Sequence, residues 1–210
     1  TVTVLDPGAG TGILSAAAIE RICTMEGVRE IHLTCYENDP VYIPMLKNNL
    51  ERIRKKCRHD FGVKLYVTVY EENYLTDSKN HYTIALYDEI REDKFDIIIC
   101  NPPLDLIDKY SPEAEAVGGV TQLKIGAPYL FARLAAKHLE PQGQLVIILP
   151  TLSATSSGLA SFRKEMADRL ALRKIHLRAG KQKNPRRAVP PKNNLALAHA
   201  NQQQTATIDV

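Results

Sequence analysis

The chain has 210 residues, which is enough for one sizeable core with or without a short extension. Its hydrophobic content of 44% and charged content of 24% are typical of a globular protein, and its net charge of +3 is too small to indicate a nucleic-acid partner by itself. No apolar run approaches the ~20 residues that span a bilayer, and no secretory leader is recognisable. The sequence therefore predicts a cytoplasmic protein with no membrane partner.

The first part of the chain alternates between strand and helix patterns. Short apolar runs that end in polar or glycine residues indicate strands, and apolar residues three or four apart indicate helices. In chain order, we expect a strand at 2–5, a helix at 13–25, a strand at 31–36, a helix at 40–54 and a strand at 65–70. Gly27 stands where a helix C-cap falls, and Pro44 favours a later start of the second helix. Because the chain opens directly on a strand, we also expect that an upstream segment is missing.

The same alternation continues in the second part. In chain order, we expect a strand at 95–100, a helix at 127–139, a turn at 141–143, a strand at 145–149, a helix at 159–170 and a strand at 172–177. The run at 95–100 is apolar apart from Asp96, as in a central parallel strand. The pattern predicts an α/β fold with a doubly wound, mostly parallel, Rossmann-like sheet, and ligands beyond the carboxyl ends of its strands.

The last part of the chain differs in composition. We expect residues 1–178 to form the core and residues 179–210 to form a basic, polar and poorly ordered tail. Between Arg163 and Lys192, eleven basic residues face only two acidic ones. Such a stretch would attract a phosphate backbone, but a solvated helix face followed by a loose tail explains it equally well.

Cysteine and histidine residues give no sign of a metal site. Cys23, Cys35, Cys57 and Cys100 form no CxxC pair, and six histidines show no ligand spacing such as HExxH. We expect buried, reduced cysteines and no bound metal.

A glycine-rich loop joins the first strand to the first helix. The sequence Asp-Pro-Gly-Ala-Gly-Thr-Gly at 6–12 permits a tight turn and lets a ligand approach the backbone. No Gly-Lys-Ser/Thr follows, which excludes a triphosphate-binding loop. Glu37 ends the second strand, 25 residues after Gly12, where a carboxylate can accept both hydroxyl groups of a ribose. Asn73 or Glu72, after the third strand, could contact an adenine, and Tyr74 could pack on it. These features predict a nucleoside cofactor.

The most informative stretch ends the strand at 95–100. Pro102 restricts Asn101 to extended geometry, and Pro102 and Pro103 stiffen the turn that holds the amide at the sheet edge. The N6 amine of adenine is a poor nucleophile because its lone pair is delocalised into the ring. If the Asn101 side-chain oxygen and the Pro102 carbonyl accept its protons, the lone pair can turn toward a methyl donor.

Together, the loop at 6–12, Glu37 and Asn-Pro-Pro at 101–103 resemble the amino-type DNA methyltransferases, most of all the adenine-N6 enzymes of bacterial restriction–modification systems. The similarity covers about residues 1–178, and the motif order resembles the γ arrangement, in which a target-recognition domain follows the catalytic part. The resemblance implies S-adenosylmethionine as cofactor and double-stranded DNA with a flipped adenine as substrate, with the recognition domain missing or on a separate subunit. It implies a target site at Asn101, Pro102, Pro103 and Leu104. The expected cofactor contacts are Asp6, Pro7, Gly8, Ala9, Gly10, Gly12, Glu37, Asn38, Asn73 and Tyr74.

Three positions depart from the family pattern. Leu104 stands where Tyr or Phe usually follows Asn-Pro-Pro and stacks on the target base, Leu152 stands where a second aromatic residue is common, and Asn73 replaces an acid. We hypothesise from these departures that the chain has weak or no activity. Two alternatives stay open: a methyltransferase that acts on RNA adenine or protein glutamine, and a non-catalytic remnant that binds nucleic acid or a partner chain.

Overall fold

The computed structural model describes residues 1–77, 94–119, 124–177 and 203–209. The strands of its main sheet are β1 (Val2–Asp6), β2 (Glu30–Tyr36), β3 (Lys64–Tyr70), β4 (Phe95–Cys100), β7 (Leu139–Pro150), β8 (Ala171–Leu177) and β9 (Gln203–Asp209). The long helices are α1 (Ile13–Cys23), α2 (Ile43–Phe61), α5 (Ala127–Lys137) and α7 (Ala160–Arg169). Within the described ranges, every helix is too short or too polar to cross a membrane.

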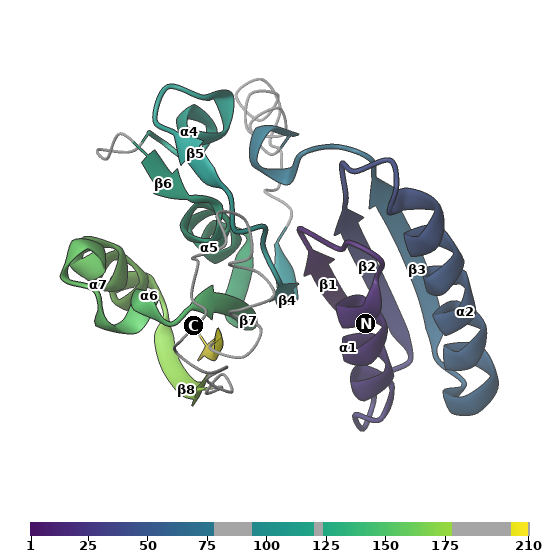
Figure 1. Ribbon diagram of the computed structural model, residues 1–210. Coiled ribbons are helices and arrows are strands. Elements are labelled where there is room, and N and C mark those ends of the chain that lie inside the picture. Colours follow the sequence, from purple (N-terminus) through teal and green to yellow (C-terminus); the bar gives the residue numbers. More distant parts are fainter. Residues whose placement is uncertain (78–93, 120–123, 178–202, 210) are drawn as a thin grey trace, which may run out of the picture.

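The seven strands lie in the order β3-β2-β1-β4-β7-β9-β8 (Figure 1). The first five of these pair in parallel, and β9 runs antiparallel to both of its neighbours. This arrangement confirms the predicted α/β fold with a mostly parallel sheet.

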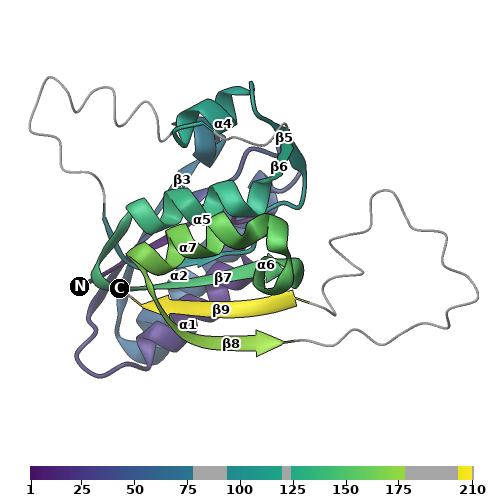
Figure 2. The same cartoon turned by 90° about the vertical axis from the view of Figure 1, so that its left-hand side faces the viewer.

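Helices cover both faces of the sheet, as Figures 1 and 2 show from two sides. Neighbouring residues of a strand point to opposite faces, so β1 contributes to two cores. Val4 packs with Leu33 and Leu46 under α1 and α2, whereas Leu5 packs with Ile98 under α5. The near-continuous apolar runs of the sequence reflect this burial on two sides.

Helix α2 begins at Ile43 and continues well beyond the predicted end at residue 54. Pro44 occupies the first turn, where the missing N–H costs no hydrogen bond. The buried side chains keep helical spacing to Cys57, and Gly62 ends the helix with a φ of 68°. The prediction stopped early because residues 54–61 are mostly charged on their outer face.

Strand β7 is longer than predicted because residues 141–143 form an irregularity inside the strand, where we expected a turn before it. The register between β4 and β7 shifts between Phe95 and Ile97, and Gln142 has a φ of 67°. The close approach of Gly143 to the Asp96 carbonyl explains the glycine: a Cβ atom there would lie 3.0 Å from that oxygen.

The sequence patterns missed a folded excursion between β4 and α5. It contains the strands β5 (Leu106–Asp108) and β6 (Lys124–Gly126), which pair antiparallel, and the helix α4 (Pro112–Ala116). Elements of three to five residues are too short to show a hydrophobic period. The short helix α6 (Leu152–Thr155), after β7, was missed for the same reason.

The structure also differs from the tail expected over 179–210. Residues 203–209 form β9, which pairs with β7 and β8 inside the main sheet. Their sequence, Gln-Gln-Thr-Ala-Thr-Ile-Asp, has little apolar character, so it carried no hydrophobic strand signal, and backbone pairing on both sides defines the strand. Residues 178–202, which hold the rest of the expected tail, lie outside the described residues.

Candidate active site

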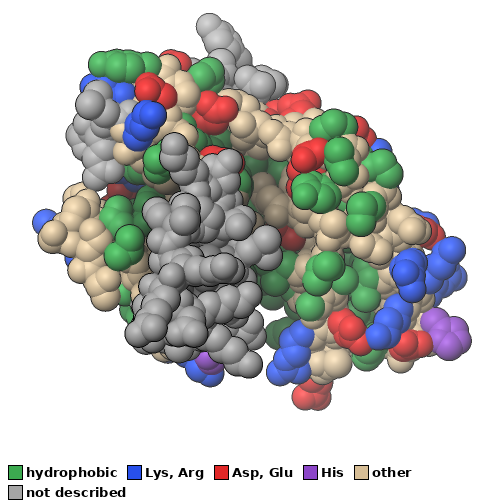
Figure 3. All heavy atoms as spheres, viewed as in Figure 1, with side chains coloured by type: hydrophobic (Ala, Val, Ile, Leu, Met, Phe, Trp, Pro, Cys, Tyr) green, Lys and Arg blue, Asp and Glu red, His purple; other side chains and the backbone are tan. Residues whose placement is uncertain are grey.

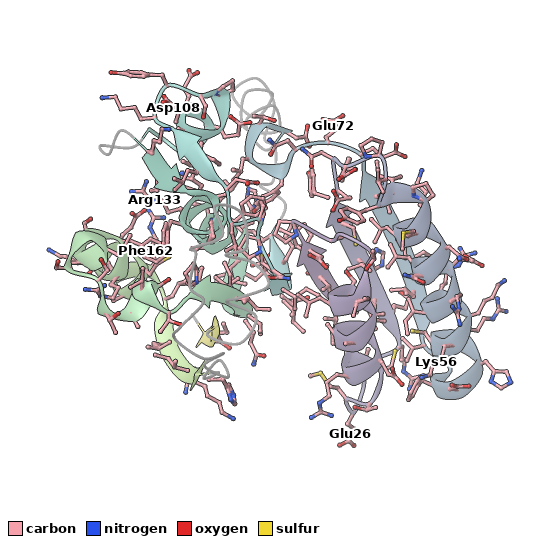
Figure 4. All side chains as sticks on the ribbon, in the orientation of Figure 1. Glu26, Lys56, Glu72, Asp108, Arg133 and Phe162 are labelled. Carbon is pink, nitrogen blue, oxygen red and sulfur yellow. The ribbon has the colours of Figure 1, made fainter. Side chains whose placement is uncertain are left out.

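A cavity of about 410 Å³ lies at the carboxyl ends of the parallel strands, where ligands bind in open α/β sheets. Its walls come from the segments that follow β1, β2, β3 and β4, together with α5. The lining residues are Pro7, Gly8, Gly10, Tyr36, Glu37, Asn38, Asp39, Tyr42, Glu72, Asn73, Tyr74, Asn101, Pro103, Asp105 and Phe131. Figure 3 shows acidic side chains along the upper edge of the molecule, and Figure 4 labels Glu72 at the same edge.

The loop at 6–12 is shaped by its backbone. The Ala9 N–H donates to the Tyr36 carbonyl at 2.9 Å, which joins the loop to the end of β2. Gly12 has a φ of 80°, and a Cβ atom there would lie 2.8 Å from Leu46 on α2. Glycine is therefore required at this position both by conformation and by packing.

Asp6 is buried and does not line the cavity. Its carboxylate accepts a hydrogen bond of 2.5 Å from the Ser15 hydroxyl and a longer one from the Gly8 N–H. Burial raises the pKa of Asp6 to about 6, the hydrogen bonds from Ser15 and Gly8 oppose this, and the nearby negative charge of Glu37 adds to the rise. Asp6 therefore ties the end of β1 to the first turn of α1, behind the cavity wall.

Glu37 holds the loop from the cavity side. Its two carboxylate oxygens accept hydrogen bonds from the N–H groups of Gly10, at 2.7 Å, and Asp39, at 2.8 Å. A carboxylate oxygen has two lone pairs. Each oxygen thus keeps one acceptor position, and together these could serve the two hydroxyl groups of a ribose.

Aromatic rings line one wall of the cavity. The Tyr74 ring is buried and contacts the rings of Tyr36 and Phe131, with centroid distances of 5.3 and 5.6 Å. The Tyr74 hydroxyl lies 2.9 Å from Nδ1 of His138, at the end of α5. This packing fixes an apolar surface on which a purine could lie.

The turn after β4 comes close to the glycine loop. A Cβ atom on Gly8 would lie 3.9 Å from the Asn101 carbonyl oxygen and 3.7 Å from the Phe131 ring. Asn101 is exposed at the cavity, whereas Pro102 is buried beneath it. The structure thus brings the predicted cofactor loop and the predicted target-binding turn into one cavity.

The expected site residues fall into two groups. Those that line the cavity are Pro7, Gly8, Gly10, Glu37, Asn38, Asn73, Tyr74, Asn101 and Pro103. Those that do not line it are Asp6, Ala9, Gly12, Pro102 and Leu104. Ala9 and Pro102 are buried, and Leu104 is half-buried outside the cavity.

Sequence reasoning missed several residues of the cavity wall. Tyr36 and Asp39 flank Glu37, and Asp105 follows the Asn-Pro-Pro turn, so their places at strand ends could have indicated them. Tyr42 directly precedes α2, and Phe131 lies in α5. No local pattern marks Phe131, because only the path of the excursion brings α5 to the cavity.

The residues present fit S-adenosylmethionine. The volume lies in the range of small-molecule pockets. Paired acceptor positions on Glu37 suit a ribose, and the Tyr74 and Phe131 rings suit a purine. The missing side chain of Gly8 leaves room between the loop and Asn101, where a Cβ would stand.

Comparisons with known proteins place the chain among its relatives. A model of the Eco57I restriction-modification methylase family matches residues 28–183. The type II methyltransferase M.PstI from Providencia stuartii is 30% identical over 174 residues, which cover 83% of this chain and 33% of the relative. The chain therefore spans about a third of the length of this curated relative.

Solved structures share the fold. A class I S-adenosylmethionine-dependent methyltransferase structure from Listeria monocytogenes has a TM-score of 0.65 and 16% identity over 99% of this chain and 53% of its own. The M protein of the type I restriction enzyme EcoKI has a TM-score of 0.52 and 15% identity, over 99% of this chain and 39% of its own. With the class I fold, a cavity suited to the cofactor and a family match over most of its length, the chain belongs to the Eco57I restriction-modification methylase family.

Proposed function

We propose that this chain carries the cofactor site and the target-amine site of a methyltransferase that modifies the N6 amine of adenine in DNA, as part of a restriction–modification system. The observation that carries the proposal is the approach of Asn101 to Gly8 within one cavity. A methyl group can pass directly between two bound molecules only if their sites adjoin.

In this proposal, residues at the carboxyl ends of β1, β2 and β3 would hold the cofactor. Glu37 accepts the ribose hydroxyl groups with its remaining lone pairs, and the backbone of Gly8 and Gly10 borders the methionine part. Asn38, Asn73 and Tyr74 surround the adenine. The bound cofactor supplies an electrophilic methyl group on a sulfonium centre.

Asn101 and Pro102 act on the target amine. The Asn101 side-chain oxygen and the Pro102 carbonyl accept hydrogen bonds from the two N6–H groups, which directs the nitrogen lone pair toward the methyl donor. The proton that N6 loses after methylation passes to solvent. The buried Pro102 ring restricts Asn101 to extended backbone. This rigidity lets the two acceptors act without reorganisation during the reaction.

Double-stranded DNA is the proposed partner, with the target adenine turned out of the helix. M.PstI is a type II methyltransferase, and a further structural relative, with a TM-score of 0.58, is DrdV in complex with DNA. One residue of the basic segment 163–192 has a local role. In its described part, Arg163 donates to the Ser153 and Ser156 carbonyls, so it serves the local fold. A recognition domain on the rest of the parent chain, or on a second subunit, would provide sequence specificity.

Leu104 weakens the proposed activity. An aromatic residue at this position would stack on the target base, and such stacking contributes ~1–3 kcal/mol. Its loss lowers the rate by ~5–150-fold if the whole effect falls on the transition state. Leu152 is 64% exposed and is absent from the cavity wall, so it offers no replacement.

A methyl-transfer assay tests the proposed function. The full chain is incubated with methyl-labelled S-adenosylmethionine and mixed-sequence DNA, and the DNA is hydrolysed to nucleosides. We expect label in N6-methyladenine at a low rate, and a larger signal for Leu104→Tyr. Parallel reactions contain RNA or a protein substrate. Label that enters only one of these would show that it, and not DNA adenine, is the target.

A non-catalytic binding module is the second candidate, and Leu104 and Leu152 favour it. It predicts that calorimetric titration detects S-adenosylmethionine binding while no substrate gains label, even after Leu104→Tyr. Transfer by the Leu104→Tyr variant alone would identify a degenerate enzyme.

A further inference from the structure

One hydrogen bond joins the cofactor side of the cavity to the excursion that follows the catalytic turn. The Asn73 side-chain Nδ2 donates to Oε1 of Glu113 at 3.2 Å. Asn73 lies after β3 in the cavity wall, and Glu113 lies in the first turn of α4, outside that wall. The two segments lie side by side at the top of the molecule in Figures 1 and 2, and Figure 4 labels Glu72 and Asp108 on either side of this junction.

Both polar atoms of the Asn73 side-chain amide make hydrogen bonds. Its Oδ1 accepts a hydrogen bond of 3.0 Å from the Leu75 N–H, and this orients Nδ2 toward Glu113. An aspartate at position 73 could accept from Leu75 in the same way, but it would present a second oxygen to the Glu113 carboxylate. Only an amide satisfies both neighbours.

The Glu113 carboxylate is the acceptor in this contact, and its helix holds it in place. Among the described residues, its carboxylate makes this one hydrogen bond. The helix that carries it is firmly placed, because the Ser111 hydroxyl accepts from the Ala114 N–H and the Ala114 and Val117 side chains are buried in the core. The contact therefore links two positioned segments, whose residues Leu75 and Val117 also belong to one hydrophobic core.

We propose that Asn73 and Glu113 are a matched positioning pair, which fastens the first part of the excursion, residues 101–119, to the cofactor side of the cavity. The excursion begins at Asn101, so the pair couples the target side of the site to the cofactor side. Asn73 borders the proposed adenine position, and a cofactor bound there would strengthen the contact. This coupling rests on the proposed function, whereas the contact itself does not.

The contact explains one departure from the family pattern. An acid usually follows the third strand in the enzymes that this sequence resembles, whereas position 73 carries an amide here, which can donate to Glu113. The pair is complementary in hydrogen-bonding role, because the amide donates and the carboxylate accepts. Changing one member should be harmful, and changing both should restore the contact.

Hydrogen–deuterium exchange of residues 111–119 in the full chain without cofactor tests the contact. Asn73→Asp should speed exchange by about fivefold, because it sets two carboxylates against each other in a half-buried place. Glu113→Ala should have a similar effect. Glu113→Gln is the matched control, because its side-chain oxygen still accepts from Asn73 and exchange should stay near that of the unchanged chain. In the double variant Asn73→Asp with Glu113→Gln, the new amide can donate to the new carboxylate, and slow exchange should return.

S-adenosylhomocysteine, a stable product of the cofactor, tests the coupling. Its binding should slow exchange of residues 111–119 about threefold further in the unchanged chain. In Glu113→Ala, this additional protection should disappear, whereas the melting temperature should change little. A contact that only stabilised the fold would not produce this loss of cofactor-dependent protection.

The outcomes separate the two proposals. Unchanged exchange in Asn73→Asp, or no recovery in the double variant, would overturn the positioning pair whatever the cofactor does. Rescue in the double variant without any binding of S-adenosylhomocysteine would keep the pair and overturn the proposed function.

Discussion

The loop after β1 and the segment after β4 both leave the carboxyl end of a parallel strand, and both border the same cavity. The structure holds them by different means. The loop is tied by hydrogen bonds of Asp6, Ala9 and Glu37, and the bond between Asp6 and Ser15 is buried. The turn is stiffened by two prolines, and its excursion meets the cofactor side through Asn73 and Glu113. Damage to the loop should therefore reduce stability, whereas damage to the turn should reduce catalysis and leave the fold intact.

Asn101→Ala gives the largest expected effect on the catalytic side. Removing one preorganised polar group at a reacting centre typically lowers the rate ~100–1000-fold. Labelled-methyl transfer to DNA should fall by this factor, while the melting temperature and the affinity for S-adenosylhomocysteine stay close to those of the unchanged chain. A large loss of stability instead would show that the turn, like the loop, is part of the structural framework.

The buried carboxyl of Asp6 gives the largest expected pH effect on the loop side. Its pKa is raised from its ordinary value of 3.8 to about 6, so the folded state binds the proton more tightly than the unfolded state. The contribution to the free energy of unfolding is therefore fully present below pH 4 and is lost as pH rises through about 6, with a total of about 3 kcal/mol. Denaturant titrations between pH 4 and 7 should show this decline, and the difference from Asp6→Asn should follow the same window. Parallel curves for the two proteins would contradict it.

Gly12→Ala tests how tightly the loop packs. A side chain at the positive φ of position 12 lowers the free energy of unfolding by ~1 kcal/mol. The distance of 2.8 Å between its Cβ and the Leu46 side chain lowers it by a further ~2 kcal/mol. Gly27→Ala is the matched control, because Gly27 has a φ of 81° but open space around its Cβ position. Urea unfolding should show a loss of ~3 kcal/mol for the first variant and ~1 kcal/mol for the second. Equal losses would mean that conformation, and not packing against α2, sets the requirement.

Leu104→Tyr should have the smallest effect, and in the opposite direction. A stacking ring beside Asn101 should raise the rate of methyl transfer to DNA about tenfold. Leu104 is half-buried outside the cavity wall, so the melting temperature should change little. Leu152→Tyr, at an exposed position away from the cavity, is the matched control and should leave the rate unchanged. Turnover of the unchanged chain at ordinary enzyme rates would remove the degeneracy hypothesis.

The sequence predicted those parts of the molecule that depend on local patterns. The apolar runs at 2–5, 31–36 and 95–100 are strands, and the loop at 6–12 meets Asn101 as the order of the motifs implied. The parallel sheet follows from the alternation of strands and helices. The prediction for α2 stopped at residue 54, because charged residues follow it in the sequence. The buried side chains of the helix nevertheless continue to Cys57.

Features that depend on tertiary pairing could not be predicted. Three-residue strands such as β5 and β6 have no period of their own, and β9 is defined by two neighbours distant in sequence. In the site, Asp6 looked like a ligand because it begins the motif, but its carboxylate points to Ser15. Phe131 enters the cavity from a helix that no motif marks.

The position of β9 between β7 and β8 has a consequence for biosynthesis. During translation, β7 and β8 leave the ribosome well before the strand that separates them. Until residues 203–209 have emerged, β7 has no partner on one side and β8 has no partner in the sheet. Unpaired strand edges favour wrong pairing and aggregation. The nascent chain is therefore most vulnerable between the emergence of β8 and that of β9, when the strands that border the cavity can already be folded.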